Sequence, residues 1–461
     1  MLKIYNTLSG KKEAVNLKNG KAVQLFVCGP TVYDYSHLGH ARTYIAFDVI
    51  AKYLKEKWFD VFYLQNITDI DDKIIQRAKE KNLAPERLAK NFEKEYLQDM
   101  KSLRIDSVTK YARATDYIKE IIEQVKTLQE KGFAYQIADG IYYDISRFKS
   151  YGKLSRRTAL QAEDAVSRID ESKEKRNKGD FCLWKFSKPD EPQWPSPWGQ
   201  GRPGWHIEDT AITQKFFGAQ YDMHGGAKDL IFPHHEAEIA QMEAISGKSP
   251  VVKYWIHTGF LTVNGKKMSK SLGNFITIND FVRQHSARIL RFLVIKNHYR
   301  SPTDYVENSV AQAKKELARI DEFVTRLDGV NHKLKKGHNL TLKAERAFEA
   351  AMEDDFNTPK AIACVFDLIG QQNSFIDKNQ LNKADAQDIL KFLKKIDRIL
   401  GFIFWPKAKE KTPPEIITLM EEREKQRKEN NWQKADEIRK KVIELGWQIE
   451  DTKDGPKLKK L

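Results

Sequence analysis

VQLFVCGPTVYDYSHLGHAR, residues 23–42, joins a short β-branched and aromatic run to a Gly-Pro break and then to a helical pattern. The run predicts a fully buried strand that ends at Pro30. A second apolar run, DVFYLQNIT at residues 60–68, predicts another strand. A strand, a helix and a strand in this order form a βαβ unit. We therefore expect a parallel sheet that binds ligands at the carboxyl ends of its strands, where Cys28 and Thr68 fall.

The rest of the chain divides by pattern into further parts. Residues 106–200 predict an inserted segment that follows the first half of the fold, 1–105, and ends in a loop dense in Pro, Gly and Trp. The α/β pattern returns over residues 201–304. Residues 305–404 are almost purely helical, which is typical of a bundle. A Pro/Lys linker opens the tail, 405–461, for which we expect two helices and a short strand, WQIEDT. On the second of these helices we expect one apolar stripe, formed by Trp432, Ala435, Ile438, Val442 and Leu445.

Composition limits the class of protein. The chain has 461 residues, of which 41% are hydrophobic, so it can bury several cores. Its 79 basic and 64 acidic side chains give a formal net charge of +15, which suits a polyanionic partner such as nucleic acid. No run is long enough to span a membrane, and the first residues lack the apolar region of a signal peptide. Cys28, Cys182 and Cys364 lie far apart, which argues against a disulfide framework and favours a cytoplasmic protein.

HLGH, residues 37–40, lies where the first predicted strand turns into its helix. Backbone N–H groups and the positive end of the helix dipole meet there, so phosphate is the expected guest. Gly39 lets an adenine or a ribose approach the backbone, and His37 and His40 share one helix face and can donate to phosphate oxygens. The alternative is a pair of histidines that only cap the helix.

NGKKMSKSLGN, residues 264–274, is a second phosphate candidate. Lys267 and Lys270 are flexible point charges beside hydroxyl groups, in a loop that can move onto a charged ligand. Alone, this pattern is most often a solvated turn. Its combination with HLGH, a whole domain earlier in the chain, is a strong indication of a phosphate site built from both motifs.

DLIFPHHEAEIA, residues 229–240, predicts a helix whose first turn contains Pro233. His234 and Glu238 are then four residues apart on one helix face, whereas His235 points elsewhere. Imidazole and carboxylate at this spacing are good zinc ligands, and Cys28 is the natural third. A surface His–Glu pair is the equally weighted alternative.

Together these motifs resemble those of the cysteinyl-tRNA synthetases, which are class I aminoacyl-tRNA synthetases, and the resemblance covers essentially the whole chain. It implies an α/β fold: a Rossmann-type parallel-sheet catalytic domain with an insertion, then an α-helical bundle and a small C-terminal α+β anticodon-binding domain. The segments that carry the resemblance are CGPTVYDYSHLGHART, NITDIDDKI, RPGWHIE, FPHHEAEIAQ, HTGFLTVNGKKMSKSLGNF, DDFNTPKA and KADEIRKK.

The resemblance implies roles for individual residues. His37, His40, Lys267 and Lys270 are the implied catalytic residues, because the histidines meet ATP and the lysines belong to a mobile loop that stabilises the leaving pyrophosphate. The implied ATP-binding residues are Gly39, His37, His40, Asp229 and Lys270. Thr68 and Trp205 fall at positions that line the amino-acid pocket. The family usually has HGGG where this chain has HGGA, and the methyl group of Ala227 either crowds that turn or is tolerated there.

The metal ligands of the family are matched in part. A zinc ion held by two cysteines, a histidine and a glutamate binds the substrate's thiolate. Cys28, His234 and Glu238 match, whereas Asp209 stands where the second cysteine is usual. A carboxylate carries the charge of a thiolate but is harder, so Asp209 either ligates zinc or moves outward and leaves three protein ligands. We expect weaker zinc retention with thiolate selection preserved.

The resemblance implies a ligase that joins L-cysteine to tRNA(Cys) through a cysteinyl-adenylate, with ATP and Mg²⁺ as the nucleotide substrate and one zinc ion per chain. Neither step needs a protein nucleophile, because positioning and stabilisation of phosphate charge supply most of the catalysis. We expect a monomer without a membrane partner. Cys28 is therefore a predicted metal ligand and forms no acyl-enzyme.

Three alternatives remain open at this point. An H-x-G-H nucleotidyltransferase would have no use for the KMSKS loop or the tail. A ligase that joins activated cysteine to an amino sugar would share the catalytic domain but need no anticodon reader. An RNA-binding protein without activity would be expected to have a damaged HLGH or KMSKS motif, and both are intact.

Overall fold

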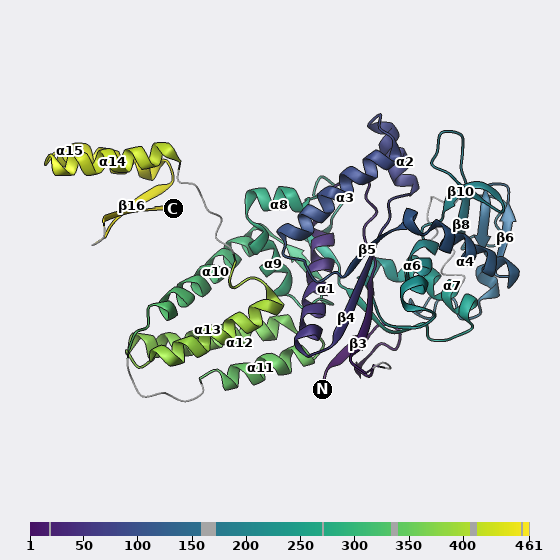
Figure 1. The fold of residues 1–461 in the computed structure, drawn as a ribbon, viewed down its shortest axis with the longest axis horizontal. Helices are drawn as coiled ribbons and strands as arrows, with labels where there is room; N and C mark the ends of the chain where they lie inside the picture. Colours follow the sequence, from purple (N-terminus) through teal and green to yellow (C-terminus); the bar gives the residue numbers. More distant parts are fainter. Residues whose placement is uncertain are drawn as a thin grey trace. The chain divides into compact units, whose positions relative to one another are not determined.

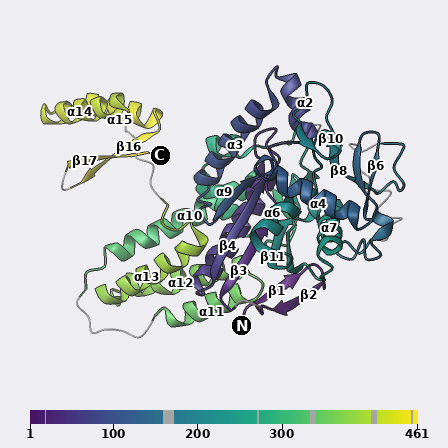
Figure 2. The ribbon, with the colours of Figure 1, turned by 45° about the vertical axis from the view of Figure 1, so that its right-hand side comes forward.

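The computed structural model describes residues 1–17, 20–157, 172–269, 272–332, 340–405, 413–452 and 455–460. The chain divides into two compact units, Met1–Phe404 and Trp405–Leu461 (Figures 1 and 2). The larger unit contains a parallel sheet, an antiparallel sheet and the helices packed on them. The boundaries predicted inside this unit, at residues 105, 200 and 304, stay predictions.

A five-stranded parallel sheet forms the centre of the larger unit. Its first strand lies in the middle, the next two strands follow on one side, and the last two lie on the other side. This is the strand order of a Rossmann fold, and the direction of chain addition reverses between β3 and β11. In spatial order the strands are β12 (Val252–Thr258), β11 (Tyr221–Ala227), β3 (Ala22–Val27), β4 (Asp60–Ile67) and β5 (Lys110–Arg113).

The predicted βαβ unit is confirmed. β3 and β4 pair in parallel with Val23 opposite Val61, and helix α1 (Leu38–Glu56) connects them. Consecutive residues of β3 are buried, as expected for a strand covered on both faces. Helix α1 is buried around most of its surface because it packs on the sheet and on α9 (Ala287–Ile295). Full burial of one side chain such as Phe47 stabilises the fold by about 1.5–3 kcal/mol.

A second sheet, antiparallel, is built from the segment that follows β5 (Figure 1). It packs on helix α4 (Ile118–Glu130) around the fully buried Trp184. The Pro- and Trp-rich stretch predicted to be a loop contributes two of its strands, and the second of these leads directly to Trp205. The strand order is β6 (Ala134–Ile137), β7 (Gly140–Tyr143), β8 (Phe181–Phe186), β10 (Gly199–Pro203) and β9 (Trp194–Ser196).

Shorter elements surround the two sheets. The N-terminal hairpin is β1 (Lys3–Asn6) with β2 (Lys11–Ala14). The helices beside the parallel sheet are α2 (Asp72–Glu80), α3 (Pro85–Ser102), α6 (Ile207–Phe217), α7 (Glu236–Ser246) and α8 (Ile278–Gln284). A three-stranded sheet consists of β13 (Leu261–Val263), β14 (Lys266–Lys267) and β15 (Thr303–Tyr305).

The predicted helical region is confirmed. Buried Arg291 on α9 links this region to helix α1: its guanidinium lies 2.6 Å from Asp48 on α1 and donates to the Leu400 carbonyl at the end of the helical region. The helices are α10 (Glu307–Asp328), α11 (Leu342–Glu353), α12 (Thr358–Asp377) and α13 (Lys383–Leu400).

The smaller unit has its own core, formed by Ile416, Val442 and Ile449 with their neighbours. It contains the two expected helices and the WQIEDT strand, together with a second strand that the sequence analysis did not include. The predicted apolar stripe on its second helix is wrong at both ends, because Trp432 is 57% exposed and Leu445 is 43% exposed. The elements are α14 (Pro414–Lys428), α15 (Trp432–Glu444), β16 (Trp447–Thr452) and β17 (Gly455–Lys460).

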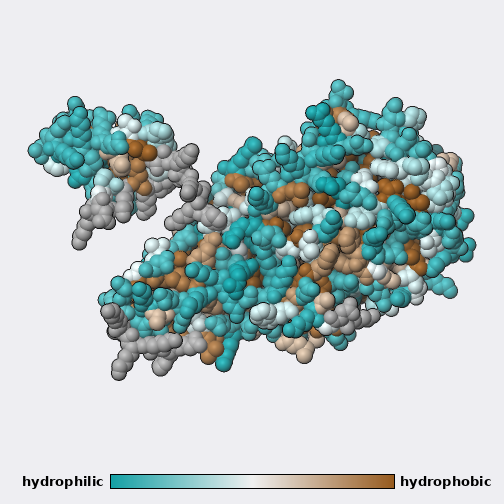
Figure 3. All heavy atoms as spheres, in the orientation of Figure 1, coloured by the Kyte–Doolittle hydropathy of each residue, from teal (hydrophilic) through white to brown (hydrophobic). Residues whose placement is uncertain are grey.

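The surface seen in Figure 3 is mostly hydrophilic, with scattered apolar groups. Among the described helices, none is both long and apolar enough to cross a membrane.

Candidate functional site

The carboxyl ends of β3 and β11 meet where the order of the sheet reverses. The backbone N–H of Cys28, one residue beyond β3, donates to the carbonyl of Gly225 on β11 at 2.9 Å. A Cβ atom at Gly225 would lie 2.3 Å from the Phe47 ring, so only glycine lets the strand approach α1 this closely. In folds of this kind, ligands bind at this switch point. The Cys28 side chain therefore begins at the edge where a ligand is expected.

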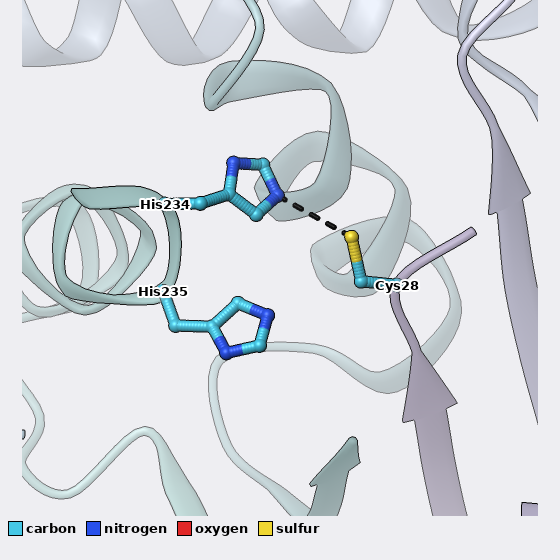
Figure 4. A group of neighbouring side chains, drawn as sticks. All are labelled: Cys28, His234 and His235. Carbon is cyan, nitrogen blue, oxygen red and sulfur yellow. Dashed lines mark hydrogen bonds between the residues drawn. The ribbon is translucent and has the colours of Figure 1, made fainter. Parts of the chain in front are cut away.

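Four of the predicted ligands come together around one nitrogen, His234 Nε2. It lies 3.5 Å from Cys28 Sγ, 3.0 Å from Asp209 Oδ2 and 3.1 Å from Glu238 Oε1. All four side chains are buried. Figure 4 shows His234 and Cys28 approaching each other from two elements, with His235 beside them. Cys28, Asp209 and the His234–Glu238 pair come from three distant parts of the sequence, so their convergence is a property of the fold.

Helices α6 and α7 supply the two carboxylates, and the turn before α7 supplies His234. Asp209 lies in the first turn of α6, and Glu238 lies in the first turn of α7. The prediction that Pro233 occupies the first turn of that helix is wrong, because α7 begins at Glu236 and Pro233 follows a cis peptide bond in the separate turn before it. His234 still reaches Glu238, since the turn continues into the helix.

Burial and the repulsion between neighbouring negative charges raise the pKa values of acidic groups in this cluster. Burial, and then the charges of Asp209, Glu238 and Glu208, raise the pKa of the Cys28 thiol well above its usual value. Burial and the charge of Asp209 likewise raise the pKa of Glu238. Among the described residues, no lysine or arginine forms an ion pair with these carboxylates. Such a group of acids is costly to bury unless a cation accompanies it.

Buried polar atoms without a hydrogen-bond partner also indicate that a cation belongs in the cluster. A neutral imidazole nitrogen carries at most one proton, so His234 Nε2 cannot satisfy two carboxylates. Asp209 Oδ1 and Glu238 Oε1 are buried without a hydrogen-bond partner among the described side chains. Asp209, His234 and Glu238 each offer one atom within 4.8 Å of the others, which is the spacing of ligands around one metal ion. Oxygen, nitrogen and sulfur donors together suit zinc.

Further histidines that the sequence analysis did not select surround the cluster. His206 Nδ1 lies 2.7 Å from His234 Nδ1, which leaves His234 Nε2 to face the acids. The prediction that His235 points elsewhere is wrong, because His235 is buried in the same cluster and contacts His257 at 2.8 Å. Burial lowers the pKa of His257 to about 3, and it lowers the pKa of His206 and His235 well below the usual value. These rings are neutral near pH 7.

Thr68 and Trp205, the predicted pocket residues, lie on two sides of the cluster. Trp205 stacks on His234 with ring centroids 4.3 Å apart, and the Lys73 ammonium lies 5.9 Å from the centre of the indole. Thr68, buried at the end of β4, donates its hydroxyl hydrogen to Glu208 and contacts Asn66 at 3.4 Å. The sequence analysis did not select Glu208, although it directly precedes Asp209.

HLGH forms the start of helix α1, and its two histidines cap the N-terminus of the helix. The Gly39 N–H donates to His37 Nδ1 at 3.0 Å, and the His37 N–H donates to His40 Nδ1 at 3.3 Å. The rings stack with centroids 3.8 Å apart. Burial, and then the charge of His37, lower the pKa of His40. Since Nδ1 accepts a hydrogen bond in both rings, the neutral forms carry their proton on Nε2. Both histidines therefore cap the helix through their Nδ1 atoms.

The structure brings the segment that follows KMSKS against HLGH. The Leu38 N–H donates to the Ile276 carbonyl at 3.2 Å, and the Ile278 N–H donates to the Ser36 carbonyl at 2.9 Å. Lys267 is exposed on the hairpin of β13 and β14, and its carbonyl accepts a hydrogen bond from the Asn274 side chain at 3.2 Å. Lys270 lies outside the described residues.

Asp229 and Ala227 lie just beyond the metal cluster. Asp229 is exposed in a short 3₁₀ turn after β11, at the carboxyl edge of the sheet, and does not join the cluster. Ala227 ends β11 with ordinary extended backbone angles, φ −79° and ψ 154°. An alanine adopts these angles without backbone strain.

Family models match most of the chain. The model described as the tRNA synthetases class I (C) catalytic domain matches residues 14–315, and the model described as the DALR domain matches residues 347–404. The first match spans the parallel sheet, the inserted sheet and the site residues. The second spans the last two helices before the smaller unit and ends where the larger unit ends.

Curated relatives match along their whole length. A cysteine–tRNA ligase of Thermococcus gammatolerans is 43% identical, with 100% of this chain and 99% of the relative covered. A cysteine–tRNA ligase of Methanococcus maripaludis is 44% identical, with both chains covered completely. One of Thermoplasma volcanium is 45% identical, with 98% of each chain covered.

Solved structures of other synthetases share the fold. A methionyl-tRNA synthetase of Mycobacterium tuberculosis in complex with methionyl-adenylate has a TM-score of 0.60 at 16% identity, covering 83% of this chain and 88% of that one. A LeuRS of Agrobacterium radiobacter in a ternary complex with tRNA and LeuAMS has a TM-score of 0.62 at 11% identity, covering 83% of this chain and 84% of that one. These likenesses concern the fold alone. The relatives and the catalytic-domain match show that this chain belongs to the class I tRNA synthetases and, among them, to the cysteine–tRNA ligase family.

Proposed function

We propose that this protein joins L-cysteine to tRNA(Cys) at the expense of ATP, through a cysteinyl-adenylate. One observation carries the proposal. At the switch point of the sheet, the Cys28 thiol and two carboxylates converge on Nε2 of His234, and the strand that leads to Cys28 is followed by the helix that HLGH caps. The cluster around His234 suits a metal that binds a thiol, and the capped helix end suits a nucleotide phosphate. A small amino acid can reach both, because the same strand-to-helix segment carries them.

The nucleotide half of the site consists of His37, His40 and the KMSKS loop. In the first step a carboxylate oxygen of cysteine attacks the α-phosphorus of ATP. Pyrophosphate leaves with the electron pair of the bond that joined it to that phosphorus. Both imidazoles present Nε2–H donors, which can bind phosphate oxygens without transferring a proton. We assign Lys267 and Lys270 to the leaving pyrophosphate, Gly39 and Asp229 to the nucleotide, and Mg²⁺ to the ATP that enters.

We assign the metal position to zinc, held by Cys28, His234, Glu238 and Asp209. The unpartnered oxygens of Asp209 and Glu238 support direct ligation by both carboxylates. When bound, zinc would bond the thiolate of the substrate and so favour cysteine over serine, whose hydroxyl group ionises far less readily. His206 keeps the His234 ring turned toward this position.

Selection by a metal removes the need for editing. Serine and cysteine differ by one heavy atom, and an apolar pocket distinguishes such a pair by only about 1–3 kcal/mol. Thr68 and Trp205 would close the pocket around the rest of the amino acid, since one borders the acids and the other stacks on His234.

In the second step, a hydroxyl group of the terminal tRNA ribose takes the cysteinyl group and AMP leaves. A net charge of +15 favours the approach of a polyanion. We assign anticodon reading to residues 405–461, whose helices α14 and α15 carry many basic side chains. We propose a monomer that acts in the cytoplasm, where its tRNA substrate is used.

Charging of tRNA with each amino acid in turn, with and without a zinc chelator, tests the proposal. We expect charging by cysteine alone, and we expect the chelator to abolish it. Charging by methionine or glutamate in place of cysteine would overturn the assignment. Cysteine charging that a chelator leaves unchanged would retain the ligase and remove zinc from it.

A further inference from the structure

Glu208 carries a carboxylate oxygen that nothing described in the structure satisfies. Its side chain is 1% exposed, and Oε1 accepts a hydrogen bond from the Thr68 hydroxyl group. Oε2 is buried without a hydrogen-bond partner. Among the described residues, no lysine, arginine or histidine forms an ion pair with Glu208. A carboxylate is costly to bury in this state unless a cation accompanies it.

The position of Glu208 relates this oxygen to the amino-acid pocket. Thr68 directly follows β4, Cys28 directly follows the neighbouring strand β3, and Glu208 directly precedes Asp209 in the first turn of α6. Adjacent Cα atoms are about 3.8 Å apart. The Thr68 hydroxyl group also accepts a hydrogen bond from the Asn66 amide at 3.4 Å, and Asn66 Oδ1 accepts one from the Gly29 N–H at 2.5 Å. A chain of contacts therefore links Glu208 to the residue that follows Cys28.

We propose that Glu208 binds the α-ammonium group of the amino acid, with Thr68 holding the carboxylate in place. The inference rests on the proposed function, because it takes cysteine as the ligand. In cysteine, three covalent bonds separate the ammonium nitrogen from the sulfur atom, which matches neighbouring subsites for the two groups. The ammonium supplies both the missing hydrogen-bond donor and the missing positive charge.

The subsite would also explain how the pocket rejects thiols that are not amino acids. A site built to bind a substrate N–H group discriminates strongly against an analogue without it, because the buried acceptor is then left unpaired. Glu208 would therefore require the ammonium group, as the metal cluster requires the thiol. Together they define an α-amino thiol.

The experiment compares two ligands on the zinc-loaded full-length chain by isothermal titration calorimetry. The probes are L-cysteine and 3-mercaptopropionate, which is cysteine without its amino group. For the wild-type chain we expect cysteine to bind at least about 10- to 100-fold more tightly, the factor expected for a charge-assisted hydrogen bond. Equal affinities for the two probes would overturn the inference whatever the variants do.

Glu208→Gln keeps the shape of the side chain and removes its charge. We expect it to weaken cysteine binding by about 10- to 100-fold and to leave 3-mercaptopropionate within about threefold. Glu208→Asp, which keeps the charge, should restore part of the preference. An equal loss for both probes would contradict the inference. So would a loss of zinc, measured by elemental analysis, because Glu208 would then be a metal ligand.

Asp180→Asn is the matched control. Asp180 is also buried, but it accepts hydrogen bonds from Tyr135 and Ile145 in the antiparallel sheet, so the ratio of the two affinities should not change. Charging of tRNA by the wild-type chain separates the two proposals. Its absence sinks the proposed function, whereas normal charging with an unchanged affinity ratio in Glu208→Gln sinks only the ammonium subsite.

Discussion

His234 Nε2 lies 3.0 Å from Asp209 Oδ2, and both side chains are completely buried. The distance is that of a hydrogen bond, yet the second oxygen of Asp209 has no partner among the described residues. Two groups placed this way are as well suited to share a metal ion as to bond to each other. This geometry supports the proposal that Asp209 is a metal ligand in place of a thiolate.

Asp209→Cys tests this replacement. Sulfur is a softer donor than oxygen, so we expect the variant to bind zinc more tightly than the natural chain, as measured by competition with a chromophoric chelator. Loss of a residue that only hydrogen-bonds to a metal ligand weakens metal binding by about 10- to 100-fold, and we expect a larger loss for Asp209→Ala. X-ray absorption should detect a second zinc–sulfur bond in Asp209→Cys. An unchanged zinc affinity in that variant would rule out direct ligation.

Zinc binding should release protons. Burial raises the pKa values of Cys28 and Glu238, so both groups hold their protons to a higher pH than usual, whereas a metal binds only the deprotonated forms. The apparent zinc affinity should therefore rise with pH and fall as the pH is lowered. Titration calorimetry in buffers of different ionisation enthalpy measures the released protons. Cys28→Ser should release fewer, and a pH-independent affinity would contradict the expectation.

Arg42 ties the HLGH helix to the strands around the KMSKS loop. Its buried guanidinium donates to the carbonyls of Gly259, at 3.0 Å, and Tyr299, at 3.2 Å, and also contacts Ser301 and Thr303. Lysine cannot reach all of these acceptors. We expect Arg42→Lys to lower the free energy of unfolding by about 1–3 kcal/mol and to raise the KM for ATP.

The matched control for Arg42→Lys is Arg398→Lys, because the Arg398 side chain is 66% exposed and forms only a surface pair with Glu56. It should change stability by no more than about 0.5 kcal/mol. Denaturant unfolding and ATP–pyrophosphate exchange measure the two effects. Equal behaviour of the two variants would show that the contacts of Arg42 do not hold the loop.

Asp99 on α3 should make the fold less stable as the pH rises. Burial, and then the charge of Glu95, raise the pKa of Asp99 to about 7. Between the unfolded and folded pKa values, the folded state holds a proton that the unfolded state lacks, so stability decreases from about pH 4 to about pH 7. Asp99→Asn should raise the free energy of unfolding at pH 8 by about 1–2 kcal/mol, since solvent screens part of the effect.

Urea unfolding of the Asp99→Asn variant at pH 5 and pH 8 checks the sign. The gain should be present at pH 8 and small at pH 5, where Asp99 is already neutral in the folded state. Glu123→Gln, on an exposed position of α4, should show no such difference. An equal gain at both values of pH would assign the effect to packing.

Local patterns predicted the centre of the fold because burial on both faces leaves long apolar runs. β4 lies within one residue of its expected position, and β3 ends at Val27, three residues before the predicted Pro30. The start of α7 was predicted wrongly, since a proline that suits the first turn of a helix here follows a cis bond outside it. The apolar stripe of α15 was overestimated because only tertiary packing decides which apolar residues are covered.

The candidate site was predictable only where a motif marks it. Cys28, His234 and Glu238 follow from ligand type and spacing, and Asp209 follows from the position of a missing cysteine. His206, His257 and Glu208 carry no local signal, because their roles arise from neighbours that are distant in the sequence. Only the folded chain reveals that these side chains are buried together.

The hydrogen bonds at the start of α1 also affect how ATP binding energy is used. Backbone N–H groups already fix the imidazoles of His37 and His40 in one orientation, stacked on each other. Ordering a free side chain on binding costs about 0.5–1.5 kcal/mol. A nucleotide that meets a preorganised pair avoids that cost, so more of its intrinsic affinity remains to bring the α-phosphorus and the carboxylate of cysteine into line.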